Sequence, residues 1–393
     1  MDDTKPSRPA GQRIRVTDPT AFIVDWRLRA PLLAAPNTDD DRQPAAVIRF
    51  DGAQLIPCDP GGETADLSND PAPDRLAANN RMVIYELPTA WTRRASGGEL
   101  ERGVGTFQDV LALIEPAAEG GNFADLSVLS AGRSYLGDLG VNTIELLPPE
   151  DSALSREWGY ATTNFFAPDF DLGFPEENSS PTAHRDLVAL MRALHQNGAR
   201  VFADMVMAFW RHGPHEHIDS VDFHMFDPAS HRDDPDALTS TRGYGRKEVR
   251  DGFGSTLIRF ARFVHTYDPV SGANASLSPA QQFLLAHLEH WMREYHVDGV
   301  RMDSVENVAN WDFVGNFSNR GRDLWRERWN AQGLGSDPDS RFLVVGEELS
   351  LPRERSGGGR RELLRFRVRT DAGRHCGIPG SEVAGDTGRQ TMA

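Results

Sequence analysis

The sequence has few cysteines and lysines and no long apolar runs, and these features exclude several classes of protein. Its 393 residues include two cysteines, Cys58 and Cys376, whose spacing fits neither a disulfide framework nor a CxxC metal site. We interpret them as unpaired thiols in a reducing compartment and expect a cytoplasmic protein. The polar residues 1–13 lack the apolar core of a signal peptide, and no run of about 18 apolar residues predicts a membrane span.

Acidic residues outnumber basic ones, and nearly all the basic residues are arginines. The formal net charge is −16, and the lysines are limited to Lys5 and Lys247. A chain with this charge repels nucleic acid and anionic membranes, so neither is an expected partner. The sequence gives no indication of the oligomeric state.

From residue 81 onward, apolar runs alternate with amphipathic stretches. We expect strands near 82–86, 141–147, 200–206, 298–303 and 342–347. Ser-Pro pairs at 180–181 and 278–279 are typical of helix starts, and apolar residues with a helical period follow each pair. This alternation predicts βα units and a parallel sheet.

The segment 207–277 separates the third predicted strand from the next helix. Loops beyond about 12–15 residues are unusual in a compact domain, so we expect an inserted subdomain there, within a barrel portion at 81–365. Residues 1–80 are expected to combine a disordered start with a small β-rich module. The stretch 366–393 has no apolar periodicity, and we interpret it as an irregular tail of non-native sequence.

Three of the predicted strands end in an acidic residue: Asp204, Asp303 and Glu347. In a barrel these ends converge on the face where active sites lie. Arg301 precedes Asp303 by two residues, so both side chains point the same way, and we expect the cation to keep Asp303 ionised. Glu347 follows an apolar run without an adjacent cation, so burial is expected to raise its pKa toward that of a general acid.

One ionised and one protonated carboxyl group are the minimal requirement for glycoside cleavage. The alternative is that strand-end acids cap helices or form structural ion pairs. Three acids at matching strand ends favour the functional interpretation.

Six segments, in order, resemble signature segments of the α-amylase family of glycoside hydrolases. They lie within residues 81–350 and are IYELPTAWT, GVNTIELLP, WGYATTNFFAPDFDLG, ARVFADMV, VDGVRMDSV and VVGEE. The resemblance implies an α/β fold of the (β/α)8 TIM-barrel type. It also implies a retaining double displacement on α-glucosidic bonds.

The resemblance also implies roles for single residues. Asp303 would be the nucleophile that forms a glycosyl-enzyme intermediate, and Glu347 would be the acid/base. Arg301 would orient Asp303, and Tyr160 would stack on the sugar in the cleavage subsite. Asp204 would be a structural or substrate-binding partner near Arg301.

Four positions depart from the family pattern. Ala208 and Phe209 stand where the family usually has an Asn, which commonly serves a calcium site, and a sugar-binding His. We therefore expect no cofactor, with calcium as the alternative, and Phe209 becomes a candidate substrate-binding residue. Glu306 and Asn307 replace a Lys-His pair on the leaving-group side, so they are candidates for a different specificity.

Several tryptophans and histidines are candidates for sugar or metal binding. Trp158 and Trp210 follow strand ends and are candidate sugar platforms, whereas Trp291 lies on a helical stripe and is expected in the core. His212, His215 and His217 are interpreted as polar loop residues, because their spacing lacks a matched carboxylate or cysteine pattern for zinc.

The family's third carboxylate, on the seventh strand, has no counterpart, and too few residues follow Glu347 for three more units of about 30 residues each. We therefore expect an incomplete barrel of about five βα units. The main hypothesis is a hydrolase acting on an α-glucan or oligosaccharide in carbohydrate metabolism. A transglycosylase or glucan-branching enzyme on the same site, a catalytically defective sugar-binding fragment and another barrel enzyme, such as an isomerase, are the alternatives.

Overall fold

The computed structural model describes residues 15–30, 42–91, 105–115, 135–153, 158–173, 181–215, 220–225, 227–239, 248–268 and 272–348. The predicted tail at 366–393, Cys376 and His217 lie outside these residues.

A parallel sheet of five strands forms the centre of the fold. Its strands are β5 (Ile84–Leu87), β6 (Thr143–Leu146), β9 (Arg200–Met205), β15 (Gly299–Met302) and β16 (Leu343–Gly346). They lie in the order β16-β15-β9-β6-β5, so each strand neighbours the next one along the chain. The five predicted strands and their parallel arrangement are confirmed. In the described part of the chain, β5 and β16 are edges, and the sheet does not close into a barrel.

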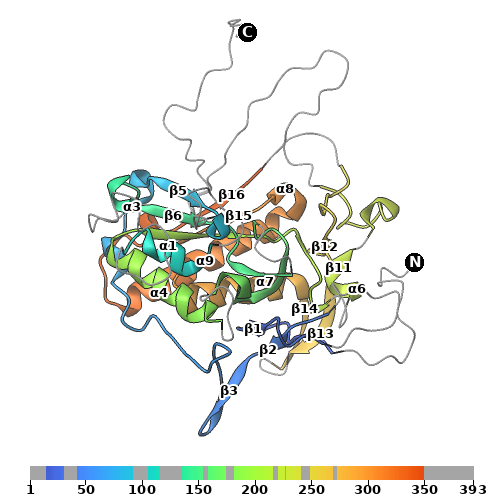
Figure 1. Cartoon of the computed structure of the whole chain (residues 1–393). Coiled ribbons are helices and arrows are strands. Elements are labelled where there is room, and N and C mark those ends of the chain that lie inside the picture. Colours follow the sequence, from blue (N-terminus) through green and yellow to red (C-terminus); the bar gives the residue numbers. More distant parts are fainter. Residues whose placement is uncertain are drawn as a thin grey trace, which may run out of the picture.

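The helices α1 (Phe107–Ala112), α4 (Ala183–Gln196), α7 (Pro279–Glu294) and α9 (Trp311–Ala331) lie along one side of this sheet (Figure 1). The short helix α3 (Tyr135–Asp138) precedes β6, the short helix α8 (Val305–Val308) follows β15, and α6 (Ser220–Phe223) lies further away. Short 3-10 turns occur at Pro73–Arg75, Asn79–Arg81, Thr89–Trp91, Phe170–Leu172, Pro228–Ser230 and Asp339–Arg341. Both α4 and α7 bury their predicted apolar stripes, because the period of 3.6 residues puts those side chains on one face.

The two Ser-Pro pairs differ in outcome. Helix α7 begins at Pro279, as predicted. Helix α4 begins two residues after its Ser-Pro pair, with Thr182 as its N-cap. There the Thr182 hydroxyl donates to the Asp186 carboxylate at 2.9 Å, and the Thr182 carbonyl accepts from the Asp186 amide, which together close the first turn.

The remaining strands form small antiparallel sheets. They are β1 (Val24–Asp25) with β2 (Ala45–Ala46), β3 (Ile48–Asp51) with β4 (Gln54–Pro57), β7 (Glu150–Ser152) with β8 (Thr162–Pro168), β13 (Val264–Asp268) with β14 (Ala273–Leu277), and β10 (Phe209–Trp210), β12 (Thr256–Ile258) and β11 (His224–Met225) as a set of three. Strands β10 to β14 and helix α6 all fall within the segment 207–277.

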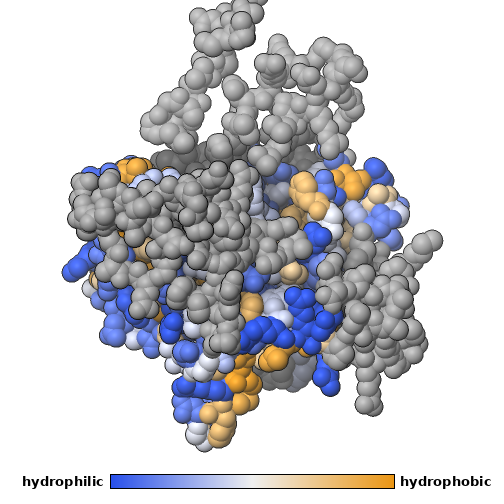
Figure 2. Space-filling model, viewed as in Figure 1, coloured by the Kyte–Doolittle hydropathy of each residue, from blue (hydrophilic) through white to orange (hydrophobic). Residues whose placement is uncertain are grey.

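The N-terminal strands pack on the central part of the chain. The Trp26 indole donates to both carboxylate oxygens of the buried Asp151 on β7. The carboxylate of Asp59 accepts the backbone N–H groups of His184 and Arg185 in the first turn of α4. The β3–β4 hairpin instead projects from the molecule, and Figure 2 shows a hydrophobic patch there. Its exposed apolar side chains are Ile48, Phe50 and Leu55.

Close approach between strands fixes the centre of the sheet. A Cβ on Gly299 would lie 2.4 Å from the Phe202 ring and 2.8 Å from the Leu343 carbonyl oxygen. Only glycine therefore allows β15 to sit between β9 and β16, and this contact brings the acidic ends of the three strands together. The helices of the described residues are each too short or too polar to cross a membrane.

Candidate active site

The predicted acids meet at the carboxyl ends of three neighbouring strands. Asp204 on β9 is in register with Arg301 on β15. Asp303 follows the end of β15, and its N–H donates to the Met205 carbonyl at 3.0 Å. Glu347 follows the end of β16, where Gly346 is in register with Met302. The sheet thus brings these side chains to one edge, as the strand-end pattern predicts.

Arg301 is the centre of this group. Its Nη1 donates to Asp204 Oδ2 at 2.6 Å and to Asp303 Oδ1 at 3.1 Å. Its Nη2 lies 2.7 Å from Glu347 Oε1. One guanidinium group therefore links three carboxylates from three strands, which fixes their relative positions.

Tyr160 joins the same group from the start of the β8 segment. Its hydroxyl donates to Asp204 Oδ2 at 2.5 Å, and the Arg301 guanidinium lies 5.7 Å from its ring centroid. Burial and the nearby Asp204 raise the pKa of the Tyr160 hydroxyl, so it stays protonated. The ring is thus held rigidly beside the carboxylates.

Negative charge exceeds positive charge in this group. We call Glu145, Asp204, Arg301, Asp303 and Glu347 the carboxyl-end cluster. Burial, followed by the charge of Asp204, raises the pKa of Asp303 to about 8, although Arg301 opposes the shift. The prediction that Arg301 keeps Asp303 fully ionised is therefore wrong for the free site, because one cation does not offset burial and several neighbouring carboxylates.

The prediction that Glu347 lacks an adjacent cation is also wrong. β16 pairs with β15, so Arg301 reaches Glu347 from the neighbouring strand. Glu347 Oε2 also accepts the Ser304 N–H at 3.3 Å. A hydrogen bond between the two carboxyl groups further raises the pKa of Asp303. A sugar that enters between the two carboxyl groups must therefore part this pair.

Glu145 on β6 is a member of the cluster that the sequence analysis missed. Burial and the charges of Asp204 and Glu86 raise the pKa of Glu145 to about 7. Glu145 lies inside a strand instead of at its end, and the strand-end criterion therefore passed over it. An acidic residue between the buried Ile144 and Leu146 is the signal that could have identified it.

The chain is similar in sequence to known carbohydrate-active enzymes. No protein-family model matches the chain. A 1,4-alpha-glucan branching enzyme of Rubrobacter xylanophilus is 27% identical over 242 residues, covering 61% of this chain and 25% of that enzyme. A 1,4-alpha-glucan branching enzyme of Kitasatospora aureofaciens is 26% identical over 305 residues, covering 76% of this chain and 32% of that enzyme. The chain is therefore similar to 1,4-alpha-glucan branching enzymes over 61–76% of its length.

The chain spans about a quarter to a third of the length of these two relatives. Among solved structures, pullulanase type I of Bacillus subtilis, complexed with maltose, has a TM-score of 0.47 and 20% identity over 86% of this chain and 38% of that chain. That score is too low to establish a common fold, so the fold assignment rests on the sheet itself.

The predicted platform and specificity residues of the chain differ in accessibility. Trp158 is 55% exposed beside Tyr160, so its ring is accessible. Phe209 is 3% exposed, so it does not present a surface to a sugar in this structure, against the prediction. Trp210 is also buried, which removes it as a platform, and Trp291 lies in the core as predicted.

The predicted leaving-group residues lie on the short helix α8. Asn307 is buried and uses both ends of its amide within the protein, because Nδ2 donates to Ser304 Oγ and Oδ1 accepts the Asp251 N–H. It is therefore a structural link instead of a free sugar-binding group, which corrects the prediction. Glu306 lies beside it and is half-buried.

His215, a described histidine of the segment 207–277, packs against aromatic rings. The His215 ring lies 5.0 Å from the Trp210 ring centroid and 4.1 Å from that of Phe223. Burial lowers the pKa of His215 to about 4, so its ring is neutral. Among the described residues, no three histidine, cysteine or acidic side chains lie together in a way that could hold a metal ion.

A second charged group lies at the opposite, amino end of the strands. We call Asp70, His195, Asp298 and Arg328 the amino-end cluster. Asp70 Oδ2 accepts from His195 at 2.7 Å and from Arg328 at 2.8 Å, and His195 Nε2 lies 2.9 Å from Asp298 Oδ2. Asp298 directly precedes β15 and accepts the Val201 N–H, so the cluster ties α4, α9 and two strands together.

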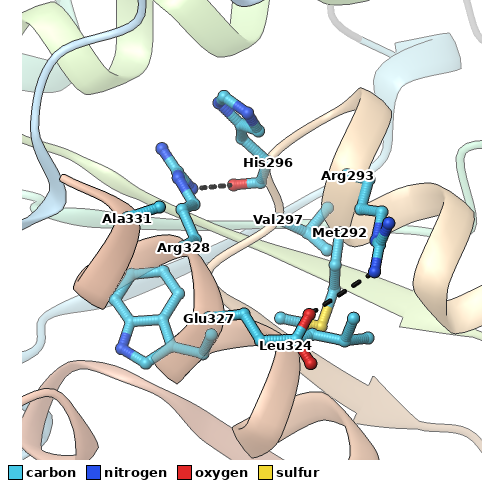
Figure 3. A pocket seen from close by; sticks show the side chains of 9 residues that line it. Met292, Arg293, His296, Val297, Leu324, Glu327, Arg328 and Ala331 are labelled. Carbon is cyan, nitrogen blue, oxygen red and sulfur yellow. Dashed lines mark hydrogen bonds and ion pairs between the residues drawn. The ribbon is translucent and has the colours of Figure 1, made fainter.

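A cavity of about 330 Å³ lies next to the amino-end cluster, between α7 and α9 (Figure 3). Arg328 lines it and donates to the His296 carbonyl at 3.3 Å, and Arg293 contacts Glu327 at 3.4 Å. None of the residues around Asp303 lines this cavity, so it is separate from the candidate active site.

Proposed function

We propose that the chain cleaves α-glucosidic bonds by a retaining double displacement, with Asp303 as nucleophile and Glu347 as acid/base. The observation that carries the proposal is the bridge from Arg301 to both carboxylates at the ends of adjacent parallel strands. The proposed substrate is an α-glucan or oligosaccharide, because the relatives are named 1,4-alpha-glucan branching enzymes.

The shared position of the two carboxyl groups suggests how the reaction starts. With the pKa of Asp303 raised to about 8, the pair holds one proton at neutral pH. A sugar that enters between the groups breaks their contact and leaves the proton on Glu347, beside the glycosidic oxygen. Glu347 gives this proton to the glycosidic oxygen while the Asp303 carboxylate, positioned by Arg301, attacks the anomeric carbon; the glycosidic C–O bond breaks, the leaving-group sugar departs and a glycosyl-enzyme ester remains. The Glu347 carboxylate then takes the proton of a water or sugar hydroxyl that attacks the same carbon, and the Asp303 carboxylate is released.

We also propose that the sheet is part of a (β/α)8 barrel. Five parallel strands in consecutive order, with helices along one side, support this architecture. A cytoplasmic location is proposed from the low cysteine content; Cys58 is buried and forms no disulfide within the described part of the chain.

The direct test measures fluoride release from α-glucosyl fluoride and reducing sugar from maltooligosaccharides. Asp303→Asn and Glu347→Gln are each expected to reduce turnover of maltooligosaccharides by at least about 10³-fold. Asp323→Asn on α9 is the control, because that side chain is 59% exposed and lies away from the site. Absence of turnover from the folded, monodisperse chain would instead support the defective sugar-binding alternative.

The shared proton makes a separate prediction about pH. Loss of the Asp303 proton above about pH 8 leaves no proton to pass to Glu347 when a sugar binds, so kcat/KM for maltooligosaccharides should fall as the pH rises through this value. Fluoride leaves without protonation, so kcat/KM for α-glucosyl fluoride should persist to higher pH. Identical alkaline limbs for the two substrates would contradict the assignment of the proton to the leaving group.

A branching-type transfer is the second candidate, favoured by the names of the relatives. Both reactions use the same glycosyl-enzyme intermediate and differ in whether water or a sugar hydroxyl attacks it. Product analysis separates them, since transfer gives longer or branched chains without a matching gain in reducing ends.

A further inference from the structure

Phe253 presents the aromatic surface that Phe209 does not. The two ring centroids are 5.9 Å apart in an edge-to-face arrangement of 65°. Phe209 is 3% exposed, whereas Phe253 is 64% exposed. Phe253 therefore leaves much of its apolar ring in contact with solvent, where a ligand can reach it.

The loop that carries Phe253 is held firmly in place. Arg250 is buried and donates to the carbonyl oxygens of Ala208, Asp236, Ile258 and Asn307. Because these carbonyls come from separate segments, the guanidinium group fixes the start of the loop against β10, β12 and α8. Phe253 therefore projects from a rigid base.

A series of hydrogen bonds connects this loop to the proposed acid/base. The Asp251 N–H donates to Asn307 Oδ1 at 2.9 Å, and Asn307 Nδ2 donates to Ser304 Oγ at 2.9 Å. The Ser304 N–H then donates to Glu347 Oε2 at 3.3 Å. An acid/base acts on the leaving-group oxygen, so these hydrogen bonds tie the loop to the residue that would serve the leaving group.

The backbone at Phe253 is strained in a way that favours glycine. Its φ is +49°, a region that L-residues with a large side chain rarely adopt. Glycines flank it at 252 and 254, yet a phenylalanine occupies the strained position. Strain of this kind is concentrated at binding and catalytic sites, where the side chain compensates for its conformational cost.

We propose that Phe253 is the platform for the sugar on the leaving-group side, which is also the acceptor sugar in transfer. This inference rests on the proposed function, because Glu347 defines the leaving-group side. The exposed ring offers a flat apolar face to the C–H face of a glucosyl residue, and its rigid loop keeps that face in place. The accessible ring next to the site is therefore a specificity determinant for an α-glucan acceptor.

Binding can be measured without turnover. In the chain carrying Asp303→Asn, calorimetric titration with maltotetraose is expected to give a Kd about tenfold higher after Phe253→Ala, and within about twofold of the parent after Phe253→Tyr. Phe253→Gly should weaken binding as much as alanine while raising the melting temperature, because glycine relieves the backbone strain. The glycine variant thus separates folding from binding.

The matched control is Phe263→Ala, since Phe263 is 52% exposed in the same segment of the chain, and its Kd should equal that of the parent. In the chain with Asp303 intact, Phe253→Ala should also lower the ratio of transfer to hydrolysis about tenfold. An unchanged Kd after Phe253→Ala, or no binding by the parent, overturns the inference. Absence of turnover together with binding that depends on Phe253 overturns only the proposed function.

Discussion

The amino-end and carboxyl-end clusters lie at opposite ends of the same sheet and differ in their balance of negative and positive charge. In the amino-end cluster two carboxylates face two cations. Burial alone would raise the pKa of Asp70 and Asp298, but His195 and Arg328 outweigh it, and both pKa values are lowered. In the carboxyl-end cluster four carboxylates surround Arg301, and the pKa values of Glu145, Asp204 and Asp303 are raised.

The charge balance of the amino-end cluster suits stability, whereas the excess of carboxylates in the carboxyl-end cluster suits catalysis. Balanced pairs lower the free energy of the folded state and resist titration near neutral pH. An excess of buried carboxylates costs free energy, and the protein retains it where a proton must be held and transferred. Pairing, not burial, distinguishes the two clusters, because both exclude most solvent from their charged groups.

The largest expected effect comes from removing the cation of the carboxyl-end cluster. Arg301→Gln leaves Asp204, Asp303 and Glu347 without their common partner, so the free energy of unfolding at pH 7 should fall by about 3–5 kcal/mol. Activity should be lost as well. Below about pH 4 the carboxyl groups become protonated in both states, and the loss of stability should largely disappear.

Chemical denaturation of the wild-type chain and Arg301→Gln at pH 7 and pH 4 measures this effect. Arg320→Gln is a matched control, because Arg320 pairs with Glu289 and Glu327 on the helix surface, where ion pairs contribute about 0–1 kcal/mol. A penalty that stays the same at both pH values would show that packing of the arginine side chain, not its charge, stabilises the cluster.

A smaller effect on stability, without a direct effect on chemistry, is expected at the amino-end cluster. His195→Gln removes a group that lies between Asp70 and Asp298, and should lower the free energy of unfolding by about 3 kcal/mol at pH 6. Burial opposes protonation of His195, but the two aspartates raise its pKa to about 9. Because this folded-state pKa lies above the unfolded value of about 6.5, the stabilisation is complete below pH 6.5 and is lost as the pH rises through 9.

Thermal unfolding at pH 6 and pH 9.5 tests the prediction for His195. The wild-type chain should lose stability across this interval, and the variant should lose less. Equal losses in the two proteins would mean that another group governs the pH dependence, and the contrast between the two clusters would then fail.

The positions of the residues in the carboxyl-end cluster could be predicted from the sequence, but their pKa values could not. Alternation along a strand placed Arg301 and Asp303 on the same side, and this depends only on local geometry. The contact between Arg301 and Glu347 depends on which strands are neighbours, so a pattern along one strand does not reveal it. The pKa of Asp303 depends on the sum of burial and charges from several strands, and pairwise reasoning gave the wrong direction.

Long-range contacts also explain the errors at the platform residues. Phe209 was a candidate from its place after the third strand, but Phe253 covers it from a loop more than forty positions later in the sequence. Trp210 is buried by His215 and Phe223 of its own segment. The strands and main helices were predictable, because apolar periodicity is a local signal that the packed core preserves.

The smallest expected effect also tests the contrast most selectively. Glu145→Gln removes one carboxylate from the carboxyl-end cluster and leaves the contacts of Arg301 intact. Burial and neighbouring charges raise the pKa of Glu145 to about 7, above the usual value of about 4.3, so its ionisation costs stability at alkaline pH and nothing at pH 4. The variant should gain on the order of 1 kcal/mol in the free energy of unfolding at pH 8.5 and should match the wild-type chain at pH 4.

The exposed Asp323→Asn serves as the control, with no change at either pH. A loss of stability at pH 8.5 would mean that Glu145 is paired after all, and that the carboxyl-end cluster is balanced like its counterpart at the other end of the sheet.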